Sequence, residues 1–220
     1  MIRPTCLSKA KPCDTAPSQA EAFLPSPHRP SWRPALGMVA LLLLSACALT
    51  RPVRDTAARH LLDATVPARA TTASQPALAV AKPALPTYLD RPQLVARGAA
   101  GELRVLDEQL WSEPLDAGIA RVLAANLARL TGSAAILPAS GFVALEYDRL
   151  VELRIERCEP DPDGSLVLEA AWKLQPVTGS DIPFRNFRTV VPAAPASAAA
   201  QVAATNEALA RLARAIAAKL

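Results

Sequence analysis

The feature that most constrains this chain is a short apolar run that ends at a cysteine. Residues 36–46 contain no charged side chain and finish in two small residues immediately before Cys47. Arg29 and Arg33 lie just upstream, as the positive region of a signal peptide requires. This is the pattern of a bacterial lipoprotein signal, because lipid attachment needs a thiol at the membrane surface and the peptidase needs small side chains before its cut. The pattern predicts that residues 1–46 are removed and that Cys47 carries fatty acyl chains such as palmitate.

Two other structures compete for the same run. A transmembrane helix needs about 20 apolar residues, and residues 36–46 are too few. A buried core helix would show polar residues at a helical period, which this run lacks. Residues 1–27 are longer than such a signal needs, which fits a start site assigned too far upstream. We therefore divide the chain into a signal peptide with an over-long extension at 1–46, a lipidated tether at 47–57 and a folded domain at 58–220.

The net positive charge of the chain is confined to its first quarter. The full sequence carries +4, and residues 1–55 alone hold seven basic and three acidic side chains. Residues 56–220 are therefore balanced and lack the basic excess of a nucleic-acid-binding surface. We expect no nucleic acid among the partners.

Cysteine usage agrees with this division. Cys6 and Cys13 are lost with the signal, so Cys158 is the only cysteine expected to remain besides Cys47. No intramolecular disulfide can then form. Cys158 ends an apolar strand and is best explained as a small buried hydrophobe. A catalytic thiol would need a nearby histidine, and the mature chain has only His60.

Alternating apolar and polar residues predict several strands. The clearest lies at residues 150–158 and has one wet face. A Pro-Asp-Pro-Asp-Gly turn follows, in which Asp163 and Gly164 are expected to supply positive φ angles, and the chain returns as the second strand of a hairpin. The return strand and the other strands are expected at residues 59–64, 77–80, 93–97, 102–107, 134–137, 165–175 and 182–191.

Two helices are also expected. The first is capped by Ser112, carries one apolar stripe over residues 115–130 and ends at Gly132 in a left-handed turn. The second covers residues 198–220 and is rich in alanine, so it needs to dock against other elements to be stable. Two helices together with hairpins predict an α/β fold on a mixed sheet.

The domain lacks sequence patterns for catalysis or metal binding. It has no paired cysteines, no phosphate-binding glycine loop and no Gly-x-Ser-x-Gly. Asp161 and Asp163 are explained as turn residues rather than as a carboxylate pair. The charged side chains of residues 152–156 are expected to face solvent, with an interface edge as the alternative. We therefore expect no enzyme activity, no cofactor and no metal.

Two tryptophans carry two interpretations each. Trp172 shares a strand face with leucines and is expected in the core. Trp111 just precedes a helix and is expected to fix that helix to the sheet. The alternative is a contact anchor, because exposed aromatic residues are enriched at interfaces.

A pair of motifs resembles a known family. Tyr-Leu-Asp-Arg-Pro at residues 88–92 precedes, by about twenty residues, Trp-Ser-Glu-Pro-Leu at residues 111–115, followed by Asn-Leu at 126–127 and Ala-Trp at 171–172. In this order, behind a lipidation signal, the motifs resemble the ABC-type transport auxiliary lipoproteins, to which paraquat-inducible protein C (PqiC) belongs. The resemblance covers roughly residues 58–220.

This resemblance implies both a fold and a role. The implied fold is a three-layer α/β sandwich on a mixed sheet, similar to anticodon-binding-like and TolB N-terminal domains. The implied role is that of a non-catalytic lipoprotein of the outer membrane that faces the periplasm. Its partners would be an MCE-domain protein with its permease and ATPase, in a system that moves lipids between the two membranes and supports envelope integrity. Some members resemble ring-forming homo-oligomers, and Ala48 after Cys47 resembles the default outer-membrane address.

Two other functions remain open from the sequence. A periplasmic module that binds cell wall or polysaccharide would need an exposed polar groove with aromatic platforms. A hydrolase would have to use His60, the only histidine of the mature chain.

Overall fold

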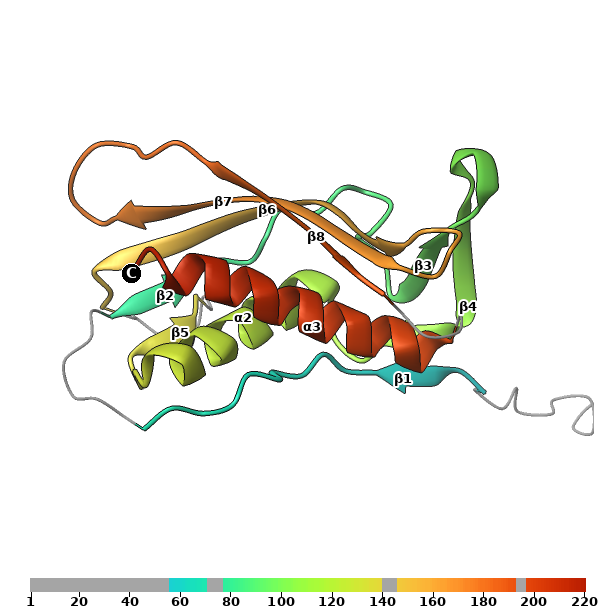
Figure 1. The fold of residues 1–220 in the computed structure, drawn as a ribbon, viewed down its shortest axis with the longest axis horizontal. Helices are drawn as coiled ribbons and strands as arrows, with labels where there is room; N and C mark the ends of the chain where they lie inside the picture. The colour runs from blue at the N-terminus through green and yellow to red at the C-terminus, as the bar shows by residue number, and fades with distance from the viewer. Residues whose placement is uncertain (1–55, 71–76, 140–145, 193–196) are drawn as a thin grey trace, which may run out of the picture. The chain divides into compact units, whose positions relative to one another are not determined.

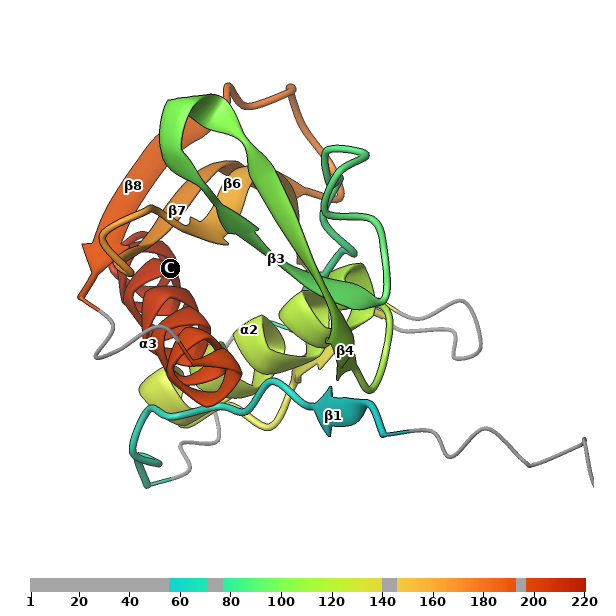
Figure 2. The same ribbon diagram turned by 90° about the vertical axis from the view of Figure 1, so that its right-hand side faces the viewer.

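The computed structural model describes residues 56–70, 77–139, 146–192 and 197–220. Two long helices, α2 (Leu115–Thr131) and α3 (Ala198–Ala217), pack side by side. Figures 1 and 2 show them between a twisted sheet on one side and the extended segment 61–70 on the other. The expected α/β sandwich with mixed strand pairing and two main helices is confirmed, although the strands form two mixed sheets where one was expected.

The larger sheet has five strands in the order β5-β2-β6-β7-β8. β2 pairs in parallel with both β5 and β6, whereas β6, β7 and β8 form an antiparallel meander. Parallel and antiparallel pairs thus meet at β6. The strand bounds are β2 (Leu78–Val80), β5 (Ile136–Pro138), β6 (Arg149–Pro160), β7 (Leu166–Pro176) and β8 (Arg185–Val191).

The β6–β7 hairpin confirms the clearest sequence pattern. Val151, Leu153 and Ile155 are buried, while the side chains between them are more exposed. Gly164 has the expected positive φ of 83° in the turn. The expectation of a positive φ at Asp163 was wrong, because its carboxylate instead accepts hydrogen bonds from the backbone N–H (2.9 Å) and the hydroxyl (2.7 Å) of Ser165.

A second, three-stranded sheet has the order β1-β4-β3, with β1 parallel and β3 antiparallel to β4. Its strands are β1 (Ala58–His60), β3 (Gln93–Arg97) and β4 (Leu103–Trp111), and a short 3-10 turn, Ala99–Gly101, joins β3 to β4. Figure 1 shows the β3–β4 hairpin standing at one end of the larger sheet. β4 runs further than the expected residues 102–107, and Leu103 and Val105 near its start are exposed.

The helix ends follow local chemistry with one correction. Ser112 does not cap α2: Pro114 occupies the cap position without a side-chain hydrogen bond, and the Ser112 N–H donates to the His60 carbonyl (2.7 Å). Gly132 ends α2 at φ 72°, as expected. The first turn of α3 is capped by Ser197, whose Oγ accepts a hydrogen bond from the Ala200 N–H (3.1 Å).

The strand expected at residues 59–64 is only partly present, since β1 ends at His60. Beyond it, the chain crosses the two helices, and Leu62 and Val66 bury their side chains. Its backbone groups bond to helix side chains instead of to a strand, which is why the ladder stops. The bonds are Asp63 N–H to Asn206 Oδ1 (3.0 Å), Val66 N–H to Asn126 Oδ1 (3.2 Å) and Arg121 Nη2 to the Leu62 carbonyl (2.7 Å).

Candidate functional site

The predicted lipidation site, Cys47, lies outside the described residues. None of the described helices has both the length and the apolar character needed to cross a bilayer. Three features stand out: the corner formed by the two family motifs, a buried charged cluster and a cleft beside that cluster.

The two motifs that carry the family resemblance meet in space. The N–H of Trp111 donates to the carbonyl of Pro92 (2.7 Å), so residues 88–92 and 111–115 form one corner at the base of the β3–β4 hairpin. Trp172 is buried in β7, which confirms its core interpretation, and Trp111 is buried in the same core as α2, as expected for a residue that fixes this helix to the sheet. This corner joins the hairpin to the start of α2.

The buried charged cluster is centred on Glu159, whose side chain is 0% exposed. Arg97 and Arg157 both pair with its Oε1, and Tyr88 with its Oε2. The five donors to this carboxylate are Arg97 Nε (3.0 Å), Arg97 Nη2 (2.7 Å), Arg157 Nε (3.0 Å), Tyr88 OH (2.9 Å) and the Cys158 N–H (3.0 Å). A buried carboxylate is tolerated only when it is paired and hydrogen-bonded in this way.

The cluster shifts the proton affinities of its neighbours. Burial, and then the hydrogen bond to Glu159, raise the pKa of the Tyr88 phenol well above its ordinary value. Burial by itself would lower the pKa of Arg157, but its hydrogen bonds to Asp161 and Glu159 raise it. Burial, and then the charge of Glu159, raise the pKa of the Cys158 thiol to about 12. Cys158 is therefore a protonated, buried thiol at neutral pH, which confirms its assignment as a small hydrophobe.

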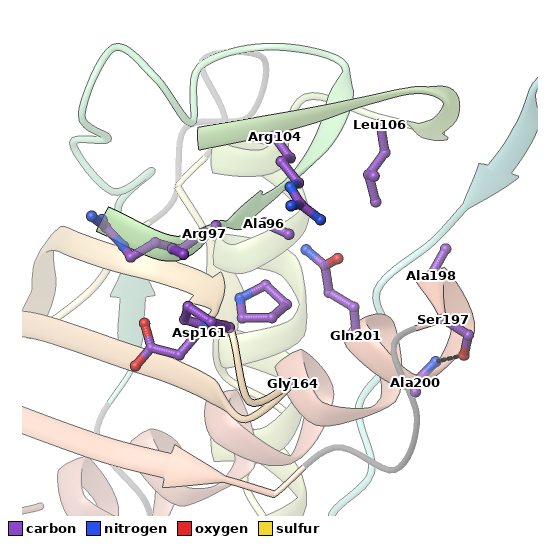
Figure 3. Close-up of a pocket in the computed structure, with 14 residues that line it drawn as sticks. Ala96, Arg97, Arg104, Leu106, Asp161, Gly164, Ser197, Ala198, Ala200 and Gln201 are labelled. Carbon is purple, nitrogen blue, oxygen red and sulfur yellow. Dashed lines mark hydrogen bonds between the residues drawn. The ribbon is translucent and has the colours of Figure 1, made fainter. Parts of the chain in front are cut away.

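A cleft of about 430 Å³ opens beside this cluster (Figure 3). Three elements form its walls: the β3–β4 hairpin, the β6–β7 turn and the first turn of α3. Most of the lining side chains are small or apolar. The polar side chains on it are Arg97, Arg104, Asp161, Ser197 and Gln201.

The remaining charged candidates have structural roles. Asp161 pairs with Arg157 (2.6 Å), while Asp163 bonds to Ser165, so the two aspartates are separate turn residues, as expected. The Nε2 atom of His60 lies 2.7 Å from Gln109 Oε1. Within the described ranges, no cluster of three or more His, Cys, Asp or Glu side chains could hold a metal ion.

The exposed face of β6 is partly covered. The cations of Arg154 and Lys173 lie 5.7 and 5.2 Å from the ring centre of Phe184. Lys173 also pairs with Glu152 (3.4 Å) and Asp181 (2.6 Å). The charged residues 152–156 thus pack under the β7–β8 connection as well as facing solvent.

Sequence reasoning missed Glu159, Arg97 and Gln201. Glu159 lies at the end of the strand pattern in the same phase as Val151 and Leu153, so an acid at an inward position was the available signal. Its partners could not be read from the sequence, because Arg97 and Tyr88 lie 62 and 71 residues away along the chain.

Comparison with known proteins identifies a matching family and solved structures with a similar fold. Residues 60–217 match the family described as the ABC-type transport auxiliary lipoprotein component. We found no match among curated proteins. The crystal structure of protein XCC0632 from Xanthomonas campestris, of the DUF330 family, is similar, with a TM-score of 0.62 and 22% identity over 73% of this chain and 93% of that chain. A crystal structure of an uncharacterized protein has a TM-score of 0.61 and 19% identity over 74% of this chain and 98% of that one.

The two solved structures establish a shared fold, and the family match extends over most of the sequence. It begins at β1, includes both motifs of the corner and ends at the last turn of α3. This protein belongs to the ABC-type transport auxiliary lipoprotein component family.

Proposed function

We propose that the protein is a lipid-anchored, non-catalytic auxiliary subunit of an MCE-type ABC system that moves lipids between the inner and outer membranes. In this proposal, residues 1–46 are cleaved as a signal peptide and Cys47 is lipidated. The domain at 58–220 faces the periplasm from the outer membrane. The observation that carries the proposal is the position of the family match, which begins thirteen residues after the cysteine of a lipidation signal.

In this proposal the protein acts as a positioning element: the acyl chains hold it at the membrane and the domain holds a transport conduit in place. Each buried CH₂ contributes about 0.8 kcal/mol, so one acyl chain gives a marginal anchor and several chains give a durable one. The tether enters the domain at β1, which pairs with residues 109–111 of β4. Segment 61–70 is then held by side chains of both helices. A force on the tether would be transmitted to the helix layer, and the domain would keep a fixed position relative to a transport conduit.

The structure favours this function over the two alternatives. A polysaccharide module needs aromatic platforms, but Trp111 and Trp172 are both buried. A hydrolase would depend on His60, which pairs with the Gln109 amide oxygen rather than with a nucleophile. An accessory subunit needs neither feature.

The anchor is tested by Cys47→Ser in the full chain, with Cys13→Ser as the matched control. We expect the Cys47→Ser protein to be absent from the washed membrane fraction. The Cys13→Ser protein should remain in the outer-membrane fraction of a density gradient. Cys13→Ser is the same substitution, made in the segment that is proposed to be cleaved. A Cys47→Ser protein that remains fully membrane-bound after a high-salt wash would refute lipid anchoring.

The partners are tested by chemical crosslinking in native membranes followed by mass spectrometry. We expect crosslinks from the domain to an MCE-domain protein, and crosslinks between copies of this chain if it forms a ring. Recovery of peptidoglycan without any transport component would instead favour the polysaccharide module.

A further inference from the structure

The cleft beside the charged cluster has the dimensions and lining of a small-molecule site. Its volume of about 430 Å³ lies within the usual range of about 300–1,000 Å³ for such sites. Ligand pockets are mostly apolar, with a few convergent polar groups that fix orientation. Here the apolar wall is made by Ala96, Ala99, Leu106, Pro160, Pro162 and Ala198.

One buried polar group in this cleft has an unused hydrogen-bonding atom. Gln201 is only 5% exposed, and its Nε2 donates to the Val95 carbonyl (2.9 Å). Its Oε1 receives no hydrogen bond from any residue in the described part of the chain. Figure 3 shows this amide between the α3 turn and the hairpin, in the interior of the cleft. The oxygen itself is not sealed from solvent, so a water or a ligand donor in the cleft can reach it.

One cation faces the same space. Figure 3 shows the guanidinium of Arg104 directed toward Gln201, while the charged ends of Arg97 and Asp161 point away from it. Arg104 is 66% exposed, and its partner Glu102 is 4.0 Å away, so it retains donors for a ligand. Arg97 is already committed to Glu159. The cleft therefore offers an apolar wall, one accepting amide oxygen and one available cation.

We propose that this cleft binds an anionic amphiphile, with its acyl chain along the apolar wall and its head group at Arg104 and Gln201. A carboxylate or phosphate head group would accept hydrogen bonds from Arg104, and a hydroxyl or a protonated acid would donate to Gln201 Oε1. A free phosphate would leave the apolar wall in water, and a neutral hydrocarbon would leave Arg104 unused. This ligand would be one of the lipids that the proposed transport system moves, so the proposal rests on the proposed function for its source.

The experiment uses the full chain in its own membranes and a palmitic acid probe that carries a diazirine near the end of its chain. After illumination and digestion, we expect adducts on peptides that contain residues 96–106, 160–164 or 197–201. Ala200→Leu places a larger side chain into the cleft and should lower these adducts at least fivefold. Ala199→Leu is the matched control, because the neighbouring Ala199 is exposed and does not line the cleft.

Arg104→Gln tests the head-group contact, and because this side chain is 66% exposed, we expect the variant to remain folded. We expect threefold to fivefold weaker labelling by the acid probe, the size of one exposed charge contact, and unchanged labelling by its methyl ester. Unlabelled palmitate and lysophosphatidylglycerol should compete with the probe. Competition by inorganic phosphate alone would show that an anion, and not an amphiphile, is the ligand, and would overturn the proposal.

Three further outcomes would also overturn it: equal labelling of the two leucine variants, adducts confined to exposed residues such as Phe184, or crosslinks from these peptides to a protein in place of the probe. The proposed function fails differently. A chain that crosslinks to its transporter but gives no cleft adducts refutes the ligand and leaves the accessory role. If the chain gives cleft adducts but its membrane attachment does not depend on Cys47, the proposed lipid anchor is refuted and the proposed ligand is retained.

Discussion

The strongest test of the structure is to remove the charge of Glu159 while keeping its shape. Glu159→Gln replaces a carboxylate oxygen with an NH₂ group in a site where every neighbour is a donor. The new donor faces other donors, and two arginines lose their buried counter-charge. Both effects act only in the folded state, so the free energy of unfolding must fall.

The magnitude follows from burial. Removing one partner of a buried ion pair costs about 3–5 kcal/mol. The side chains of Arg97 and Arg157 keep 28% and 23% of their surface exposed, so water partly solvates them after the substitution. We therefore expect the lower end, about 3 kcal/mol. At about 2–4 °C per kcal/mol for a domain of this size, Tm should fall by about 6–12 °C.

The assay is denaturant unfolding followed by tryptophan fluorescence, because Trp111 and Trp172 are both buried. Glu156→Gln is the matched control, since this glutamate lies on the same strand but its side chain is 52% exposed and pairs with the exposed Arg154. The control should change stability by less than about 0.5 kcal/mol. If Glu159→Gln costs no more than this control, the buried cluster does not stabilise the fold as argued.

Three further predictions test separate parts of the fold. Gly132→Ala places a Cβ in a left-handed turn (φ 72°) and should lower the free energy of unfolding by about 1–2 kcal/mol in the same assay; an unchanged midpoint would contradict the turn geometry. Arg129→Ala removes hydrogen bonds to the carbonyls of Ala64 and Val66, so amides in segment 61–70 should exchange hydrogen faster while global stability falls by only about 1 kcal/mol; unchanged exchange there would show that the segment is held without Arg129. Cys158 should resist maleimide at pH 8 until the protein unfolds. Because burial raises the pKa of this thiol in the folded state to about 12 from an ordinary value of 9.0, its contribution to stability is complete below pH 9 and is lost as the pH rises from 9 through 12. Rapid native labelling, or a Cys158→Ala variant with the same alkaline loss, would contradict this.

Much of the fold could be predicted from local sequence patterns. Residues 150–158 alternate between apolar and charged side chains because β6 has a buried face and a more exposed one, and this hairpin was found in the expected place. α2 was predicted nearly to the residue, because its apolar stripe is continuous and Gly132 ends it. In both cases the pattern reflects burial against one neighbouring layer.

The segments that were mispredicted depend on distant partners. Segment 61–64 has strand-like composition, but side chains from helices about 60 and 140 residues away take its backbone hydrogen bonds. β4 was expected to end at residue 107, yet it continues to Trp111, and its Leu103 and Val105 side chains are exposed. The cleft was not predicted at all, since its walls come from three elements far apart in the sequence.

The family motifs themselves explain why the resemblance predicted the fold better than it predicted any site. Residues 88–92 and 111–115 meet at the Trp111–Pro92 hydrogen bond, which fixes the β3–β4 hairpin to α2. Tyr88 in the first motif also donates to Glu159, which ties the corner to β6. These residues stabilise the position of the hairpin that forms one wall of the cleft. A sequence match through them therefore identifies the scaffold, while the lining of the cleft, and with it the choice of ligand, can vary independently.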